Sequence, residues 1–191
     1  VLSATGLMKP LRQLVLAKQY PAEAKKVDIA DLVHSRMGNA IHKGCEIAWT
    51  DLDTIKKALK LFGMSEDAID NIKINPAFVK HGETPIYVEQ RVEKQTINNF
   101  IISGQYDLVL DGELNDFKST SVWAYIYGSN VDNYIKQGSI YKWLSPDKIT
   151  SDYVHIHYIF TDWSPAKARE KPKNYPQFKA VSKKYPLWSN E

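Results

Sequence analysis

Residues 104–118 read Gly-Gln-Tyr-Asp-Leu-Val-Leu-Asp-Gly-Glu-Leu-Asn-Asp-Phe-Lys. In this stretch two β-strand patterns flank Asp111-Gly112, a dipeptide that favours a two-residue hairpin turn. The pattern predicts strands over 106–110 and 114–118, paired around that turn. Pairing would bring Asp107 and Asp116 to one end of the sheet. Lys118 lies two residues past Asp116 and therefore on the same strand face.

The pattern outside this hairpin predicts a larger α/β structure. Alternation with a period of two, or enrichment in β-branched and aromatic residues, predicts further strands over 86–92, 97–103 and 153–160. Apolar residues at three- and four-residue steps predict helices over 7–20, 29–49, 53–62, 65–72 and 131–144. The sequence therefore predicts a central mixed β-sheet flanked by helices.

Length and composition fit one compact domain. The chain has 191 residues, of which 43% are hydrophobic, enough to form a core without a partner. We expect a core over residues 1–165 and a basic, proline-punctuated C-terminal extension without regular periodicity over 166–191. The net charge of +3 and a pI of about 8.7 suit a polyanionic partner.

Cysteine content and hydropathy exclude several classes of site. Cys45 is the only cysteine, so the chain cannot supply an internal disulfide, a thiolate zinc site or a four-cysteine iron–sulfur cluster. No apolar run approaches the roughly 18 residues of a membrane span, and no secretory signal is present. We expect an intracellular, cytoplasmic protein of a bacterium or a viral host cell that does not enter membranes, with an organelle left open.

The residues around the hairpin point to metal-dependent phosphate chemistry. Asp107, Asp116 and the backbone carbonyl of Phe117 are hard oxygen ligands of the kind that Mg²⁺ or Mn²⁺ prefers. One or two such ions would activate a water and neutralise a leaving oxygen, while Lys118 would position that water. The alternative is a surface hairpin with unrelated charges, because Asp-X-Lys is a common tripeptide.

The runs 104–107, 111–114 and 116–120 resemble the nuclease core of the PD-(D/E)XK superfamily, and in particular the RecB-like exonucleases. Residues 36–42 are similar to that family's glycine-to-histidine helix motif, residues 137–141 match its QxxxY motif, and residues 3–7 with Arg12 look like its first helix. Tyr106 stands where the superfamily's name has proline. The resemblance implies a restriction-endonuclease-like core.

The resemblance also implies roles for individual residues. It makes Asp107, Asp116, Lys118 and Glu89 catalytic, and makes His42 a metal ligand beside Asp107, Asp116 and the Phe117 carbonyl. It places five residues at the DNA: Gln137, Tyr141, Arg36, Ser119 and Thr120. The implied cofactor is Mg²⁺ or Mn²⁺, as one or two ions, without an iron–sulfur cluster.

The function that follows is a metal-dependent DNA nuclease, an exonuclease acting on DNA ends or single strands. The alternatives are a structure-specific endonuclease and a non-catalytic nucleic-acid-binding module with the same fold. DNA is the expected partner, and a protein partner from a recombination or replication system is compatible with this function.

Several residues keep two interpretations at this stage. Glu46 is either part of the site, as a partner of His42 or as a metal ligand, or a solvated side chain. His155 and His157 alternate on one strand face, which favours a half-exposed strand over a metal pair. Core packing and base stacking are both open for Trp123, Tyr125 and Tyr127, and the lysines after Pro165 either follow a phosphate backbone or are solvated.

Overall fold

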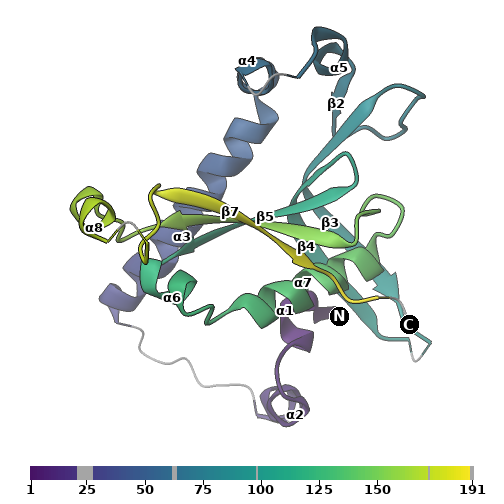
Figure 1. The fold of residues 1–191 in the computed structure, drawn as a ribbon. Coiled ribbons are helices and arrows are strands. Elements are labelled where there is room, and N and C mark those ends of the chain that lie inside the picture. Colours follow the sequence, from purple (N-terminus) through teal and green to yellow (C-terminus); the bar gives the residue numbers. More distant parts are fainter. Residues whose placement is uncertain (21–27, 62–63, 98, 172, 190–191) are drawn as a thin grey trace.

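A mixed β-sheet runs through the centre of the computed structural model, which describes residues 1–20, 28–61, 64–97, 99–171 and 173–189 (Figure 1). The strands are β1 (Leu2–Ser3), β2 (Ile72–Ile74), β3 (Thr84–Gln95), β4 (Ile101–Leu110), β5 (Glu113–Thr120), β6 (Tyr153–Phe160) and β7 (Ala180–Pro186). The helices are α1 (Ala4–Leu7), α2 (Leu11–Gln19), α3 (Ile29–Thr50), α4 (Leu52–Leu61), α5 (Glu66–Asp70), α6 (Val122–Ile126), α7 (Val131–Leu144) and α8 (Pro165–Glu170). The predicted α/β class, a mixed sheet flanked by helices, is confirmed.

The strand order is β2-β3-β4-β5-β6-β7, and β1 pairs separately with β4. Strands β3, β4 and β5 form an antiparallel meander, while β5 and β6 are parallel. A parallel pair needs a crossover connection, which α6 and α7 provide. Both Asp111 and Gly112 have positive φ angles, +47° and +79°, as the predicted two-residue turn requires.

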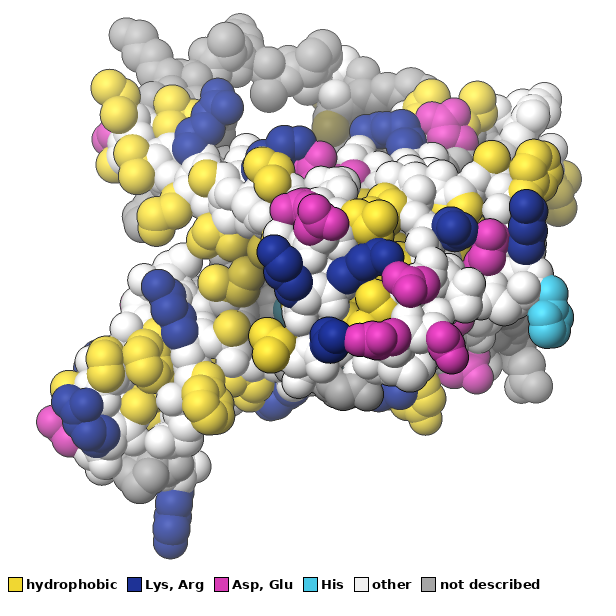
Figure 2. Space-filling model, turned by 90° about the horizontal axis from the view of Figure 1, so that it is seen from above, with side chains coloured by type: hydrophobic (Ala, Val, Ile, Leu, Met, Phe, Trp, Pro, Cys, Tyr) yellow, Lys and Arg dark blue, Asp and Glu magenta, His cyan; other side chains and the backbone are white. Residues whose placement is uncertain are grey.

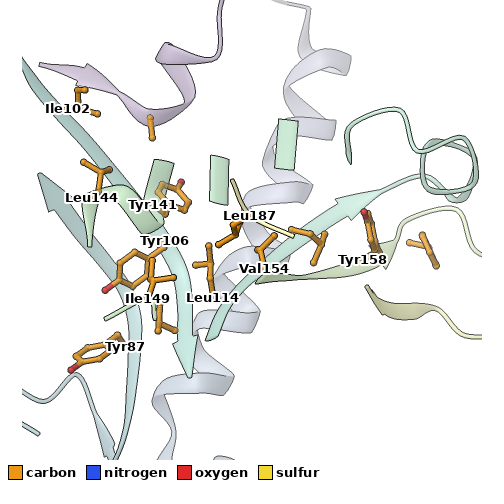
Figure 3. Packing of buried hydrophobic residues seen from close by; sticks show 14 of the residues in the cluster. Tyr87, Ile102, Tyr106, Leu114, Tyr141, Leu144, Ile149, Val154, Tyr158 and Leu187 are labelled. Carbon is orange, nitrogen blue, oxygen red and sulfur yellow. The ribbon is translucent and has the colours of Figure 1, made fainter. Parts of the chain in front are cut away.

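The sheet is packed on both faces. On one face, α7 contributes Tyr141 and Leu144 to the larger core, where they meet Tyr106 and Leu114 (Figure 3). On the other face, α3 and α4 cover a second core built on Ile86, Val88 and Leu108. At Gly104 the ring of Tyr141 lies so close to β4 that an added Cβ would come within 2.7 Å of it. This close approach fixes α7 against the central strands.

Four predicted boundaries were wrong. The helix expected over 7–20 is split into α1 and α2, because proline cannot continue a helix past its first turn and Pro10 lies at the N-terminus of α2. The two strands expected over 97–103 and 106–110 are one continuous strand, β4, of 10 residues. The helix expected over 65–72 ends at Asp70, and Ile72 begins β2, which pairs with β3. Pro21 and Phe62, at predicted helix ends, lie outside the described residues.

The fourth error concerns the segment after Pro165. It contains α8 and also β7, which pairs with β6 over Tyr153–Ile159. Tyr175 and Leu187 from this segment are buried in the larger core. The alternation along β7 is weak because most of its side chains are exposed, so hydrophobic periodicity could not reveal it. Within the described residues, no helix is both long and apolar enough to cross a membrane.

Candidate active site

The candidate site lies in a gap along one edge of β4. Strand β5 pairs with β4 only at Leu108, Val109 and Leu110, and β1 pairs with the same strand at Ile102 and Ser103. Beyond these pairs β5 turns away from β4 and pairs with β6 over its whole remaining length. The two strands of the central hairpin therefore form a fork, and Asp107 and Asp116 are the first residues beyond its last pair.

Asp107 occupies the β4 side of the fork and contacts both β5 and α3. Its Oδ2 accepts a hydrogen bond of 2.9 Å from the backbone N–H of Phe117, which has no strand partner on that side. The same oxygen lies 3.4 Å from Nδ1 of His42 on α3. The N–H and C=O of a strand residue point toward the same neighbouring strand, so the Phe117 carbonyl also faces the fork.

Glu89 lies opposite Asp107 on β3, between the pairs Val88–Leu108 and Gln90–Tyr106. Its φ angle is +51°, a left-handed conformation that is costly for a residue with a side chain. At this point the alternation of side chains between the two faces of the sheet is interrupted. Val88 and Leu108 belong to the core under α3 and α4, whereas Tyr106, two residues before Leu108, belongs to the core under α7. The local distortion turns Glu89 and Asp107 into the same crevice, which His42 also lines.

Asp116 and Lys118 form the other half of the site. As their spacing predicts, the two side chains share a face of β5, and Nζ of Lys118 lies 2.7 Å from Oδ2 of Asp116. Asp116 is 4% exposed, and this oxygen has no aligned hydrogen-bond donor among the described residues. A buried carboxylate oxygen held only by one ion pair is able to accept a further cation.

Helix α7 fixes the position of Lys118. Oε1 of Gln137 accepts a hydrogen bond of 3.2 Å from Lys118, and Nε2 of Gln137 donates to the hydroxyl of Tyr141 at 2.8 Å. Tyr141 therefore holds the side-chain amide of Gln137, and Gln137 in turn holds the ammonium group of Lys118. Tyr141 is only 4% exposed, so its predicted contact with DNA stays a prediction.

Tyr134 on α7 also belongs to this site, although the sequence analysis did not identify it as a site residue. Its ring centroid lies 5.4 Å from Nζ of Lys118, within the range of a cation–π contact. Its spacing of three residues before Gln137 on the same helix is the signal that could have found it, because residues three apart share a helical face.

Burial and charge shift the pKa values of these groups. Burial, reinforced by the charge of Asp116, raises the pKa of Asp107 to about 7. Burial, followed by the charge of Lys118, lowers the pKa of His42, so the imidazole is neutral near pH 7. Burial also acts to lower the pKa of Lys118, but the nearby charge of Asp116 outweighs it and the net shift is upward. Lys118 is therefore held as a cation.

The donor chemistry of the fork fits a hard divalent cation. Asp107, Asp116 and the Phe117 carbonyl offer oxygen atoms, and neutral His42 offers a nitrogen. Within the described parts of the chain, no group of three or more His, Cys, Asp or Glu side chains is already gathered as a metal cluster. His42 contacts Asp107 and Lys118 contacts Asp116 instead, so a cation at Asp116 would compete with Lys118 for the same carboxylate.

The remaining predicted residues lie at the edge of this arrangement. Ser119 and Thr120 are half-buried at the end of β5, where a side chain at Gly38 of α3 would approach Oγ of Ser119 to 3.3 Å. Arg36 is exposed on α3 and has no hydrogen bond or ion pair with any described residue. Glu46 lines the same crevice as His42 and Asp107, but it pairs with Lys43 at 2.5 Å and forms no hydrogen bond with either of them.

Comparison with known proteins shows that this chain is similar to solved structures in its fold. No family model and no curated protein sequence matches the chain. The crystal structure of SSO0001 is 12% identical and has a TM-score of 0.52 over 97% of this chain and 66% of that one, so this chain spans just under two thirds of that protein's length. A crystal structure of a phage-related exonuclease from Haemophilus somnus 129PT is 14% identical and has a TM-score of 0.44, over 92% of this chain and 70% of that one. The likeness to SSO0001 supports the fold and does not assign chemistry.

Proposed function

We propose that this protein is a Mg²⁺- or Mn²⁺-dependent nuclease that hydrolyses phosphodiester bonds of DNA, with the RecB-like branch of the PD-(D/E)XK superfamily as its relatives. The observation that carries the proposal is the fork itself. Two carboxylates, Asp107 and Asp116, stand at equivalent positions beyond the last pair of a hairpin, and Lys118 contacts the second of them at 2.7 Å. The motif resemblance and this geometry concern the same residues.

Each residue of the fork has a role in this reaction. A divalent ion held by Asp107, Asp116, the Phe117 carbonyl and His42 would supply an acidified water and neutralise charge on the phosphate. Lys118, kept cationic beside Asp116 and oriented by Gln137, would hold that water in line and stabilise the negative charge that develops on the phosphate oxygens. Glu89, which lines the same crevice as Asp107 and His42, would help to orient the attacking water.

The mode of attack is proposed as exonucleolytic, on ends or single strands. The test uses end-labelled linear and circular single-stranded DNA with Mg²⁺, Mn²⁺ or EDTA. Asp116→Ala is compared with Asp152→Ala, which removes an exposed aspartate that pairs with Lys142 and contacts no residue of the fork. Degradation of linear DNA only, abolished by EDTA and by Asp116→Ala but not by Asp152→Ala, is the expected result.

The other outcomes decide between the alternatives. Cleavage of circles would make the enzyme an endonuclease. If wild-type protein binds DNA but cuts neither substrate with any ion, the chain is a non-catalytic binding module and the proposed function is wrong. Full activity in Asp116→Ala would show that hydrolysis does not depend on the fork.

A further inference from the structure

Three strands end or begin together at the far end of β5. The backbone N–H of Thr161 donates to the carbonyl of Thr120 at 3.0 Å, and that of Phe160 donates to Lys179 at 3.0 Å. Oδ1 of Asp162 accepts from the first N–H of α6, that of Val122, at 2.7 Å. Helix α6 and the segment 161–179 are therefore tied to the strand that carries Asp116 and Lys118. We call this region the sheet-end surface and define it by α6 and residues 161–171 and 173–179.

Helix α6 presents an aromatic pair to solvent at this surface. Trp123 is 44% exposed and Tyr127 is 75% exposed, and their rings stack with centroids 6.1 Å apart and planes 23° apart. Tyr125 on the same helix behaves differently, because it packs edge-on against Tyr158 and Phe160 at 4.9 and 5.0 Å. Core packing thus explains Tyr125, whereas Trp123 and Tyr127 stack on each other at the surface.

The other part of the sheet-end surface carries exposed cations without an ion-pair partner among the described residues. Five exposed basic residues lie within 161–179, and none forms an ion pair with a described residue: Lys167, Arg169, Lys171, Lys173 and Lys179. The acidic residues of the segment are Asp162, which already caps α6, and Glu170. The segment therefore has an excess of positive charge that no described carboxylate neutralises.

The lysines of α4 provide a contrast within the same molecule. Lys56 pairs with Asp70 at 2.8 Å and Lys60 pairs with Glu66 at 2.5 Å. In the view from above, positive and negative side chains are interspersed over the part nearest the viewer, where α4 and α5 lie (Figure 2). That face has no net attraction for a polyanion comparable to that of the sheet-end surface.

We infer that the sheet-end surface binds single-stranded DNA, with Trp123 and Tyr127 stacking on unpaired bases while the cations of 161–179 neutralise phosphates. Exposed aromatic faces bind any unpaired base, whereas the bases of a duplex are already stacked on each other. Because α6 follows β5 directly in the chain, a strand bound there would lie at the end of the β-strand that carries Asp116 and Lys118. This inference deepens the proposed function, since it makes a single strand the form in which DNA is held.

Binding is measured by fluorescence anisotropy of a labelled 20-nucleotide oligo-dT in EDTA, where no hydrolysis can occur. Trp123→Ala/Tyr127→Ala is expected to weaken binding about tenfold or more, and Trp123→Phe/Tyr127→Phe to restore most of it. The matched control is Phe78→Ala/Ile97→Ala, which removes two exposed apolar side chains on other loops and should leave the affinity within about twofold. A 20-base-pair blunt duplex should be bound equally by the wild type and the alanine pair.

The cations are tested through the salt dependence of the same affinity. Lys167→Gln/Arg169→Gln/Lys171→Gln should lower the slope of log K against log salt by about 2, at roughly 0.7 for each phosphate that these side chains no longer neutralise. Lys56→Gln/Lys57→Gln/Lys60→Gln is the control with the same charge change and should leave the slope nearly unchanged. Circular dichroism melts establish that every variant is folded.

The inference is overturned if wild-type protein does not bind oligo-dT, if the alanine pair binds it normally, or if the alanine pair loses duplex binding to the same extent. These outcomes are independent of catalysis. A chain that binds through this surface but cuts no DNA contradicts the proposed function alone. A chain that cuts DNA but binds it without Trp123 and Tyr127 contradicts only this inference.

Discussion

Two histidines lie against the central strands of this protein, and they are held in opposite ways. His157 on β6 uses both ring nitrogens: Nε2 lies 2.9 Å from Oδ1 of Asn115, and Nδ1 lies 2.6 Å from the hydroxyl of Ser182. Since Asn115 Oδ1 can only accept, Nε2 carries a proton, and because burial lowers the pKa of His157 the ring is neutral near pH 7. Among the described residues, His42 on α3 has one polar contact, between its Nδ1 and Oδ2 of Asp107 at 3.4 Å, and its side chain is 34% exposed.

The difference extends to the charges around each histidine. Asn115 on β5 and Ser182 on β7 form hydrogen bonds with the two ring nitrogens of His157 on β6. The ring of His157 also stacks on Phe117, with centroids 5.1 Å apart. At the fork, burial and the charge of Asp116 raise the pKa of Asp107 to about 7, and an oxygen of Asp116 has no aligned donor among the described residues. The first arrangement stabilises the sheet, and the second keeps unfavourable electrostatics that a bound cation would relieve.

The largest expected effect comes from removing the charges of the fork. Asp116→Ala and Lys118→Ala should each lower the rate of metal-dependent hydrolysis about 1,000-fold or more, because each removes a group that acts on the reacting phosphate or its ion. The measurement is the initial rate on linear single-stranded DNA with Mn²⁺. A loss of less than tenfold in both variants would place the chemistry elsewhere.

The next effect concerns pH and the stability of the metal-free protein. The folded-state pKa of Asp107 is raised to about 7 from 3.8, so the folded state binds a proton that the unfolded state has released, and stability falls as pH rises from about 4 to about 7. Asp107→Asn removes this cost. The free energy of unfolding of the variant minus that of the wild type should be larger at pH 8 than at pH 5, by on the order of 2 kcal/mol.

Urea unfolding in EDTA at the two pH values gives this difference. Asp152→Asn serves as its control, because Asp152 is an exposed carboxylate that pairs with Lys142. An equal effect of Asp107→Asn at pH 5 and pH 8 would show that Asp107 titrates normally.

Substituting the two histidines tests the comparison directly. His157→Ala should cost about 2 kcal/mol of stability, because it removes two hydrogen bonds and a stacked ring, while the hydrolysis rate of the folded protein stays within about twofold. His42→Ala should show the reverse, with stability changed by less than about 1 kcal/mol and metal-dependent activity strongly reduced. If both variants lose stability and neither loses activity, the two sites do not differ as inferred.

The smallest effect is expected at Gln137. Gln137→Leu removes the acceptor that orients Lys118 and leaves the lysine's charge in place, so the rate should fall about tenfold rather than 1,000-fold. Gln137→Glu keeps an acceptor oxygen for Lys118 and should recover part of the rate. An unchanged rate in Gln137→Leu would mean that Asp116 alone positions Lys118.

Much of the site could be predicted from the hairpin because the information is local. The Asp111-Gly112 turn sets which residues of β4 and β5 are opposite, and a period of two then sets which side chains share a face. The contact between Asp116 and Lys118 follows from these two rules. The metal-ligand and DNA-binding roles assigned to His42, Glu89, Arg36, Ser119 and Thr120 stay predictions.

The elements that sequence reasoning missed depend on partners far along the chain. Strand β7 has little alternation of its own and exists because β6 offers a free edge. Glu89 reads as an ordinary strand residue, and only the pairing with β4 reveals its left-handed φ and the exchange of faces at Asp107. Tyr134 reads as a core residue until α7 is placed over Lys118.

By itself, then, the sequence determined the α/β class, the central hairpin and the carboxylate–lysine pair, because turns and strand alternation act over a few residues. Tertiary structure alone decided that β5 leaves β4 after three pairs to follow β6, which opens the fork and leaves the N–H of Phe117 for Asp107. The physical reason is competition between backbone partners: where a strand has two neighbours to choose from, its hydrogen bonds are settled by the packing of the whole sheet.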